Sequence, residues 1–288
     1  MLLEIRKSLA NKYFISICIF GIVISLLHSY IIISDYKGIS QALEVYSSKG
    51  QNPYSPITNT FTLWIGWDYK SKYSKLLFNI FPLLSVTPYC WSYSSEYRKG
   101  ITNNSIIKNG VSHYHLAKYT AVFVSSGLIM AIPLLINFLA ILLFVPPISP
   151  DSVYDIYYGV FSNSFMADTF YMHPFIYVLT FIILNFIYCG LFGCLGYAIS
   201  TIIPSRIISV LAPVFTILAI DYTKNSVIEQ NAIERKNFSP KAFLCPAKSL
   251  DTNNVIVIVE IIALFIITFF IPILRFKVIV RRRIKNEN

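Results

Sequence analysis

Side chains able to carry out chemistry are few in this sequence, and they form no familiar catalytic pattern. The sequence lacks the G-x-x-x-x-G-K-[S/T] loop that holds ATP phosphates, and it lacks the H-E-x-x-H and G-x-S-x-G motifs. His113 and His115 stand two residues apart, which places them on different sides of a helix with no third metal ligand nearby in the sequence. We therefore predict no enzymatic activity, metal or cofactor on this chain.

Four polar side chains interrupt or border long apolar runs: His28, Asn137, Asp221 and Glu260. Polar groups inside a membrane usually mark a transport pathway or a partner. We take Glu260 and Asn137 as candidate pathway residues. An alternative for Glu260 is that it lies near the outer end of its run and simply reaches the lipid headgroups. Ion-coupled transport would also need a midplane cluster of such groups, which the sequence does not display.

The elements that carry these residues are apolar enough to be membrane helices. The 288 residues are 55% hydrophobic and only 13% charged, with mean hydropathy +0.60, which excludes a soluble domain of this size. Six runs reach or approach the length of about 20 residues that crosses a hydrocarbon core: 13–34, 76–93, 117–145, 174–203, 207–221 and 255–274. We predict one all-α integral membrane domain over residues 1–288 with six transmembrane helices. Whether the short fifth run, which contains Pro213, crosses completely stays open.

Positive charge gathers on one side of these six spans. Fourteen of the 24 lysines and arginines, but only three of the 14 acidic residues, lie in residues 1–12, 94–118, 204–206 and 275–288. Cytoplasmic segments carry such an excess, so we predict a multi-pass protein of the cell membrane with both termini in the cytoplasm. Membrane topology accounts for the net charge of +10, and we expect no nucleic-acid partner.

Residues 1–12 have an amphipathic pattern. Leu2, Ile5, Leu9 and Tyr13 fall on one helical face, and Glu4, Lys7, Ser8 and Asn11 fall on the opposite face. This pattern predicts a short helix that lies in the inner membrane interface and then bends into the first span. The alternative is that these residues form only the frayed base of that span.

Small and aromatic residues predict how the spans pack and where they end. Gly190, Gly193 and Gly196 give the fourth span a stripe of small residues, along which a neighbouring helix can approach closely. Trp64 and Trp67, in the first outer loop, fit an aromatic belt at the outer interface.

The loop over residues 94–116 contains a helix signal of its own. Thr102 is a plausible N-cap, residues 103–108 can form one or two helical turns, and Asn109 with Gly110 forms a good left-handed stop. Ser112 can cap the helix that follows. Two isoleucines, Ile106 and Ile107, would be exposed beside basic residues. This combination favours a protein contact, and burial in the lipid interface is the alternative.

The order Glu96-x-x-x-Gly100, a short apolar segment, and then Lys118 at the foot of the third span resembles the loop between the second and third helices of type-2 ABC transporter permeases. The resemblance extends to the interfacial helix, the six spans and a polar outer excursion at 222–254. It implies a coupling helix that inserts into a separate cytoplasmic ATPase subunit, which would bind the ATP and Mg²⁺. The docking residues would then be Glu96, Arg98, Lys99, Gly100, Asn103, Ile106, Ile107 and Lys108.

The resemblance further implies a homodimer or a heterodimer with a second permease, working as an ATP-driven exporter. Ser112-His113 departs from the Ser-Arg or Thr-Arg pair that many members carry. The long first outer loop is similar to that of the bacterial peptide-export and antimicrobial-immunity branch, so we expect an amphipathic peptide as substrate. Two other classes stay open: a non-transporting immunity or sensing protein that binds a toxic peptide, and an ion-coupled secondary transporter.

Overall fold

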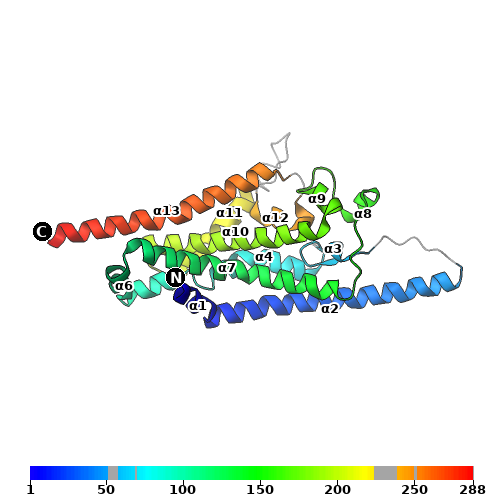
Figure 1. Cartoon of the computed structure of the whole chain (residues 1–288), viewed down its shortest axis with the longest axis horizontal. Helices are drawn as coiled ribbons and strands as arrows, with labels where there is room; N and C mark the ends of the chain where they lie inside the picture. The colour runs from blue at the N-terminus through cyan, green and yellow to red at the C-terminus, as the bar shows by residue number, and fades with distance from the viewer. Residues whose placement is uncertain (51–57, 69, 224–238, 250–251, 288) are drawn as a thin grey trace.

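The computed structural model describes residues 1–50, 58–68, 70–223, 239–249 and 252–287. Within these residues the chain is helical and has no strand, so the predicted all-α fold is confirmed. Figure 1 shows an elongated bundle. Its long helices are α2 (Lys12–Ser48), α7 (Val111–Leu142), α10 (Pro174–Ile202), α11 (Arg206–Thr223) and α13 (Asn254–Glu287).

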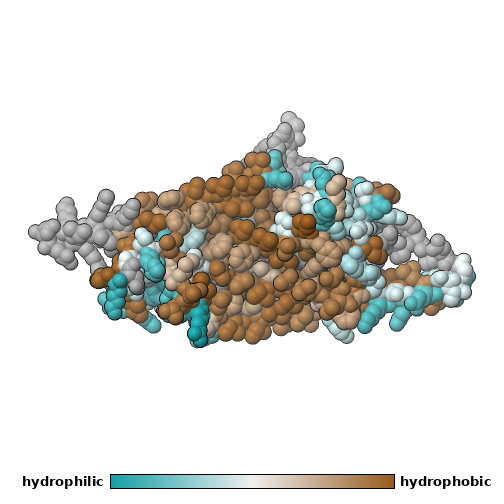
Figure 2. Space-filling model, viewed as in Figure 1, coloured by the Kyte–Doolittle hydropathy of each residue, from teal (hydrophilic) through white to brown (hydrophobic). Residues whose placement is uncertain are grey.

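Five described helices are long and apolar enough to cross a membrane: α2, α7, α10, α11 and the Asn254–Phe276 part of α13. The visible face of the bundle is covered by hydrophobic residues along its middle, while hydrophilic residues gather toward both ends (Figure 2). This distribution matches a hydrocarbon layer between two aqueous phases. The chain is therefore a multi-pass membrane protein.

The predicted second span is not one continuous helix. The run 76–93 divides into α4 (Lys72–Val86), a turn at residues 87–91, and α5 (Ser92–Arg98). Pro88 explains the break, because its nitrogen cannot donate a helical hydrogen bond and its ring collides with the preceding turn. The 15 residues of α4 extend only about 22 Å at the helical rise. The prediction of a complete helix over 76–93 is wrong, and α4 is shorter than the five spanning helices.

The other spans agree with the prediction in position but not always in length. The fourth predicted span, 174–203, matches α10, and the doubtful fifth, 207–221, lies within α11. The first span was expected to end at Ser34, but α2 continues to Ser48, so part of the predicted outer loop is helical. About half of the predicted outer excursion at 222–254 lies outside the described residues, and its described part contains the short helices α12 (Pro240–Phe243) and η3 (Pro246–Lys248).

The glycine stripe of α10 lies where other helices press against it, as predicted. A Cβ at Gly193 would lie 2.0 Å from Ser126 Oγ of α7, and one at Gly196 would lie 2.7 Å from the Ser209 carbonyl oxygen of α11. Both distances are far shorter than any normal contact. The absence of side chains at these positions thus allows α7 and α11 to pack directly on α10.

Candidate functional site

The loop between α5 and α7 folds as a separate short helix, α6 (Ile101–Asn109), at one end of the bundle (Figure 1). Gly100 and Gly110 bracket it with backbone φ angles of +72° and +78°, values that glycine adopts without steric cost. A helix at this place was predicted, and Gly110 ends it with positive φ as predicted. The predicted N-caps are wrong: Gly100, and not Thr102, occupies the N-cap position of α6, and Ser112 lies inside α7, which begins at Val111.

One side of α6 packs onto the bundle and the other side is exposed. Thr102 is buried, and Ile106 is half-buried against an aromatic cluster that includes Tyr114 and Phe276. The prediction that both isoleucines are exposed is therefore wrong for Ile106. Ile107 is 75% exposed.

The remaining predicted docking residues lie on α6 or just before it, at the same end of the bundle as Ile107. Arg98, Lys99, Gly100 and Lys108 are exposed, whereas Asn103 and Glu96 are partly buried. Arg98 donates from Nε to the Pro204 carbonyl oxygen at 3.2 Å, which ties the end of α5 to the turn before α11. The exposed surface of α6 and its flanks thus combines apolar side chains, of which Ile107 is the most exposed, with several cations.

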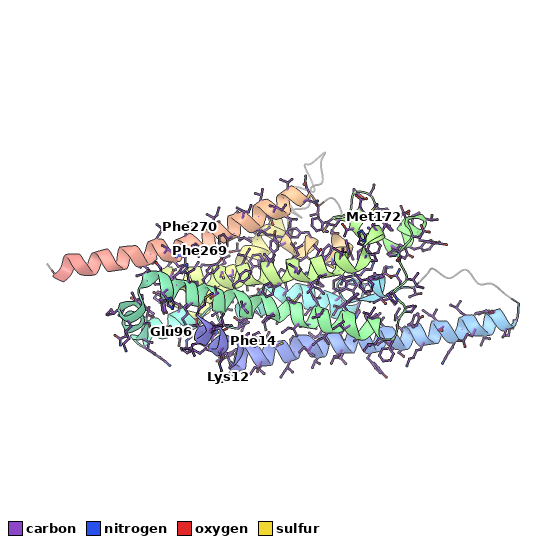
Figure 3. All side chains as sticks on the ribbon, in the orientation of Figure 1. Lys12, Phe14, Glu96, Met172, Phe269 and Phe270 are labelled. Carbon is purple, nitrogen blue, oxygen red and sulfur yellow. The ribbon has the colours of Figure 1, made fainter. Side chains whose placement is uncertain are left out.

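A buried lysine joins the base of this loop to the N-terminal helix α1 (Leu2–Leu9). Lys118 of α7 is 1% exposed, and its Nζ lies 2.5 Å from Glu96 Oε1 and 2.8 Å from Glu4 Oε2. Tyr114 donates to Glu96 Oε2 at 2.8 Å, and Tyr89 donates to Glu4 Oε2 at 3.1 Å. We call these five residues the Lys118 cluster. The cluster connects α1, α5 and α7, and Figure 3 shows Glu96 beside the start of the chain.

The charge of Lys118 dominates the environment of Glu4. Partial burial alone would raise the pKa of this carboxyl group. The Lys118 ammonium more than offsets that effect through its charge and its hydrogen bond, and Lys7 adds a second contact at 2.7 Å, so that the pKa of Glu4 falls to about 2. Glu4 is consequently ionised at neutral pH.

The short helix predicted before the first span is present as α1. Its predicted polar face contributes Glu4 to the cluster and the fully buried Ser8, while Leu2 of the predicted apolar face is 82% exposed. The sequence contained one unused signal: Lys118 lies inside a predicted apolar span, where a cation requires an anionic partner. The sequence could not assign Glu4 as that partner, because it lies more than a hundred positions away. It could not assign Glu96 either, because only the fold brings Glu96 and Lys118 together across 22 positions.

Asn137, one of the two candidate pathway residues, lies in a second buried polar contact, between α2 and α7. Its Nδ2 lies 2.9 Å from both the Ser25 carbonyl oxygen and Ser29 Oγ and 3.0 Å from His28 Nδ1. Its Oδ1 accepts from the Ile65 backbone N–H at 2.7 Å. Protein groups therefore satisfy the whole amide, which fastens the 64–68 segment onto the bundle.

The same contact continues outward to a cavity. His28 Nε2 lies 3.3 Å from Asp68 Oδ2, and Asp68 lines a cavity of about 340 Å³ together with Trp67, Lys70 and Tyr158. Trp67 stacks on Phe170 with ring centroids 5.4 Å apart, and it is only 8% exposed. Trp64 is fully buried. The two tryptophans are thus core residues, and the predicted aromatic belt is wrong for them.

Glu260, the other candidate pathway residue, is half-buried where α13 meets α10. The Tyr188 hydroxyl lies 3.2 Å from Glu260 Oε2 and 3.1 Å from the Val257 carbonyl oxygen. Glu260 thus contacts α10, whereas Asn137 contacts α2, so each has its own set of partners. Their assignment to a pathway stays a prediction.

The two histidines of the loop lie on different sides of α7, as their spacing predicts. His113 is exposed, whereas His115 is buried with Nδ1 3.2 Å from the Tyr197 hydroxyl. Within the described ranges no three histidine, cysteine, aspartate or glutamate side chains gather closely enough to hold a metal ion.

Comparison with known proteins adds no assignment to this geometry. No protein-family model matches the chain, and no curated protein or solved structure is detectably similar to it. Function must therefore be argued from the residues themselves.

Proposed function

We propose that this chain is the membrane subunit of an ATP-driven exporter of the ABC type and that α6 is the place where a separate ATPase subunit docks. The observation that carries the proposal is the exposed surface of α6 and the end of α5, which presents the apolar Ile107 together with Arg98, Lys99 and Lys108. An apolar side chain surrounded by cations is well suited to a groove with an acidic rim on a protein partner. ATP and Mg²⁺ would be bound by that partner.

The contacts around α6 could transmit a movement of this helix to the helices next to it. Glu96 binds both Lys118 and Tyr114, so α5 and α7 are tied together on either side of α6. Lys118 also binds Glu4, which adds α1 to the same unit. A displacement of α6 by ATPase closure would thereby move these helices together as a rigid body, and α7 would transmit the motion to α10 along their close glycine contact.

The remaining features of the proposal follow from the sequence. Two copies of this chain, or one copy with a sister permease, would form the pathway in a bacterial cell membrane with the α6 end in the cytoplasm. The substrate would be an amphipathic molecule, with a peptide or an antimicrobial peptide favoured. Glu260 and Asn137 would contribute to the polarity of the pathway or to the packing that shapes it.

Co-purification tests the docking role of α6. The full chain, tagged and extracted in mild detergent, is expected to retain an ATPase subunit, and Ile107→Asp is expected to lower its recovery at least tenfold, because a carboxylate would enter an apolar, acid-rimmed groove. Ile156→Asp is the matched control, since Ile156 is 78% exposed at the opposite end of the bundle. Equal recovery with both variants would overturn the proposal.

A second function, a non-transporting immunity or sensing protein, is favoured by a different observation. The cavity beside Asp68 offers a carboxylate, an ammonium group from Lys70 and the aromatic residues Trp67 and Tyr158, a combination able to bind a peptide. Binding of a peptide that persists without any ATPase and is abolished by Asp68→Asn would support this function. The secondary-transporter alternative has weaker support, because the described contacts of Glu260 include no second carboxylate.

A further inference from the structure

A groove of about 360 Å³ opens on the surface of the bundle at the same end as α6. Its walls come from the start of α2, the turn between α4 and α5, and the first turns of α11, and they include Tyr13, Trp91, Arg206, Ile207 and Leu211. Figure 3 labels Lys12, the neighbour of Tyr13, and Glu96 at this end of the molecule. Among the described residues that line the groove, none is acidic.

Arg206 is held at the mouth of this groove. Its guanidinium carbon lies 5.3 Å from the centre of the Trp91 ring, and one terminal nitrogen donates to Ser95 Oγ at 2.8 Å. A guanidinium group has five N–H donors in a planar fork, and Arg206 is exposed. The two contacts therefore fix the orientation of the group while leaving donors free to bind an anion in a bidentate way.

The surroundings of Arg206 divide into a polar and an apolar part. Lys12 lies 5.4 Å from the ring centre of Tyr13 and adds a second cation close to the groove. Beyond Arg206 the wall becomes apolar, where Ile207 is 70% exposed and Leu211 is 42% exposed along α11. Tyr13 and Trp91, whose rings meet edge to face at 5.2 Å, lie between the two parts, as aromatic residues do at a membrane interface.

We propose that this groove binds one anionic phospholipid of the adjacent leaflet. Its phosphate would bind the Arg206 guanidinium, and an acyl chain would lie along Ile207 and Leu211. The position supports this occupant, because Arg206 is the first residue of the spanning helix α11 and so stands where headgroups meet hydrocarbon. Basic pockets between membrane helices bind acidic lipid headgroups by this chemistry.

Quenching of Trp91 by brominated lipid tests the proposal. The full chain is reconstituted in phosphatidylcholine vesicles that contain increasing fractions of phosphatidylglycerol brominated on its acyl chains. Trp91 lines the groove, whereas Trp64 and Trp67 are buried elsewhere in the bundle. We expect brominated phosphatidylglycerol to quench the tryptophan fluorescence at a several-fold lower mole fraction than brominated phosphatidylcholine does. The Trp91→Phe substitution is expected to remove this difference between the two lipids.

Substitutions of Arg206 test whether this residue causes the preference for phosphatidylglycerol. Arg206→Gln is expected to raise about fivefold the mole fraction of brominated phosphatidylglycerol that quenches half of the fluorescence, which is the effect of one cation near an anionic surface. Arg206→Lys keeps the charge and is expected to keep most of the preference. Arg6→Gln removes another exposed arginine, from α1, and should change the fraction less than twofold.

Two results would overturn the proposal. Equal quenching by the two brominated lipids in the unsubstituted chain would mean that the groove does not select an anionic headgroup. A folded Arg206→Gln variant with an unchanged preference would count equally against it, and the thermal transition in vesicles establishes that the variant is folded.

Discussion

At the scale of single residues, Lys118 determines how the α6 end of the molecule is held. A buried ammonium is costly unless anions compensate it, and here two carboxylates do so from helices far apart in the sequence, Glu4 in α1 and Glu96 in α5. The phenol of Tyr89 lies beside the same ammonium, with Oη 3.4 Å from Nζ. The cluster therefore stabilises the bundle and positions the loop that carries α6.

Removing the lysine should leave two facing carboxylates without their cation. We expect Lys118→Met to destabilise the chain by about 3–5 kcal/mol, the range for breaking one side of a buried pair. Lys7→Met removes a lysine whose side chain is 64% exposed and should cost less than about 1 kcal/mol. Unfolding midpoints in detergent measure both variants, and similar losses would show that the cluster has no special role.

Acid should weaken the same cluster through Glu4. The pKa of Glu4 is about 2 in the folded chain, below its ordinary value of 4.5, so its ionised form favours folding. That stabilisation is complete above about pH 4.5 and is lost as the pH falls toward 2. We expect the difference in melting temperature between the natural chain and Glu4→Gln to narrow steadily below pH 4.5. A difference that stays constant down to pH 3 would contradict this account.

At the scale of elements, the sequence predicted the apolar helices far better than their junctions. Long apolar runs identify α7, α10 and α13 because lipid contact demands them. The hydropathy pattern gave neither the full break of the second span nor the continuation of α2 to Ser48, since hydropathy reports contact with lipid and not helical continuity.

The candidate site also has features that the sequence predicts and features that it does not. The helix α6 was predictable because Gly100 and Gly110 are local signals for its two ends. The burial of Ile106 was not predictable, since it depends on an aromatic cluster that includes Phe276 of the distant α13. The Lys118 cluster was missed for the same reason: its partners are brought together only by the fold.

The close packing of α10 gives a prediction for a whole element. Gly196→Ala would bring a Cβ within 2.7 Å of the Ser209 carbonyl oxygen, and a backbone atom cannot move aside as a side chain can. We expect a loss of about 1–3 kcal/mol. Gly38→Ala is the control, because nothing lies within 4 Å of the added Cβ in α2, and alanine favours a helix over glycine. If both variants have the same melting temperature, the close approach of α11 to α10 does not contribute to the stability of the bundle.

At the scale of the whole molecule, α6, α1 and the C-terminal part of α13 lie at one end of the bundle (Figure 1). The predicted docking cations and the Lys118 cluster share that end, while the cavity beside Asp68 lies toward the opposite end of α7, where Asp68 contacts His28 in the middle part of α2. In the proposed orientation, the cationic end would meet the cytoplasmic ATPase subunit and the cavity would lie toward the outside. The proposed export function needs such a separation.

The most direct test of ATPase docking is site-specific cross-linking from α6. All five native cysteines are buried, so an Ile107→Cys chain carries one readily labelled thiol, to which a photoactivated cross-linker is attached in the assembled complex. The account predicts an adduct with the ATPase subunit from Ile107→Cys and none from Ile156→Cys at the opposite end. A complex that remains assembled yet gives no adduct from position 107, or equal adducts from both positions, would contradict it.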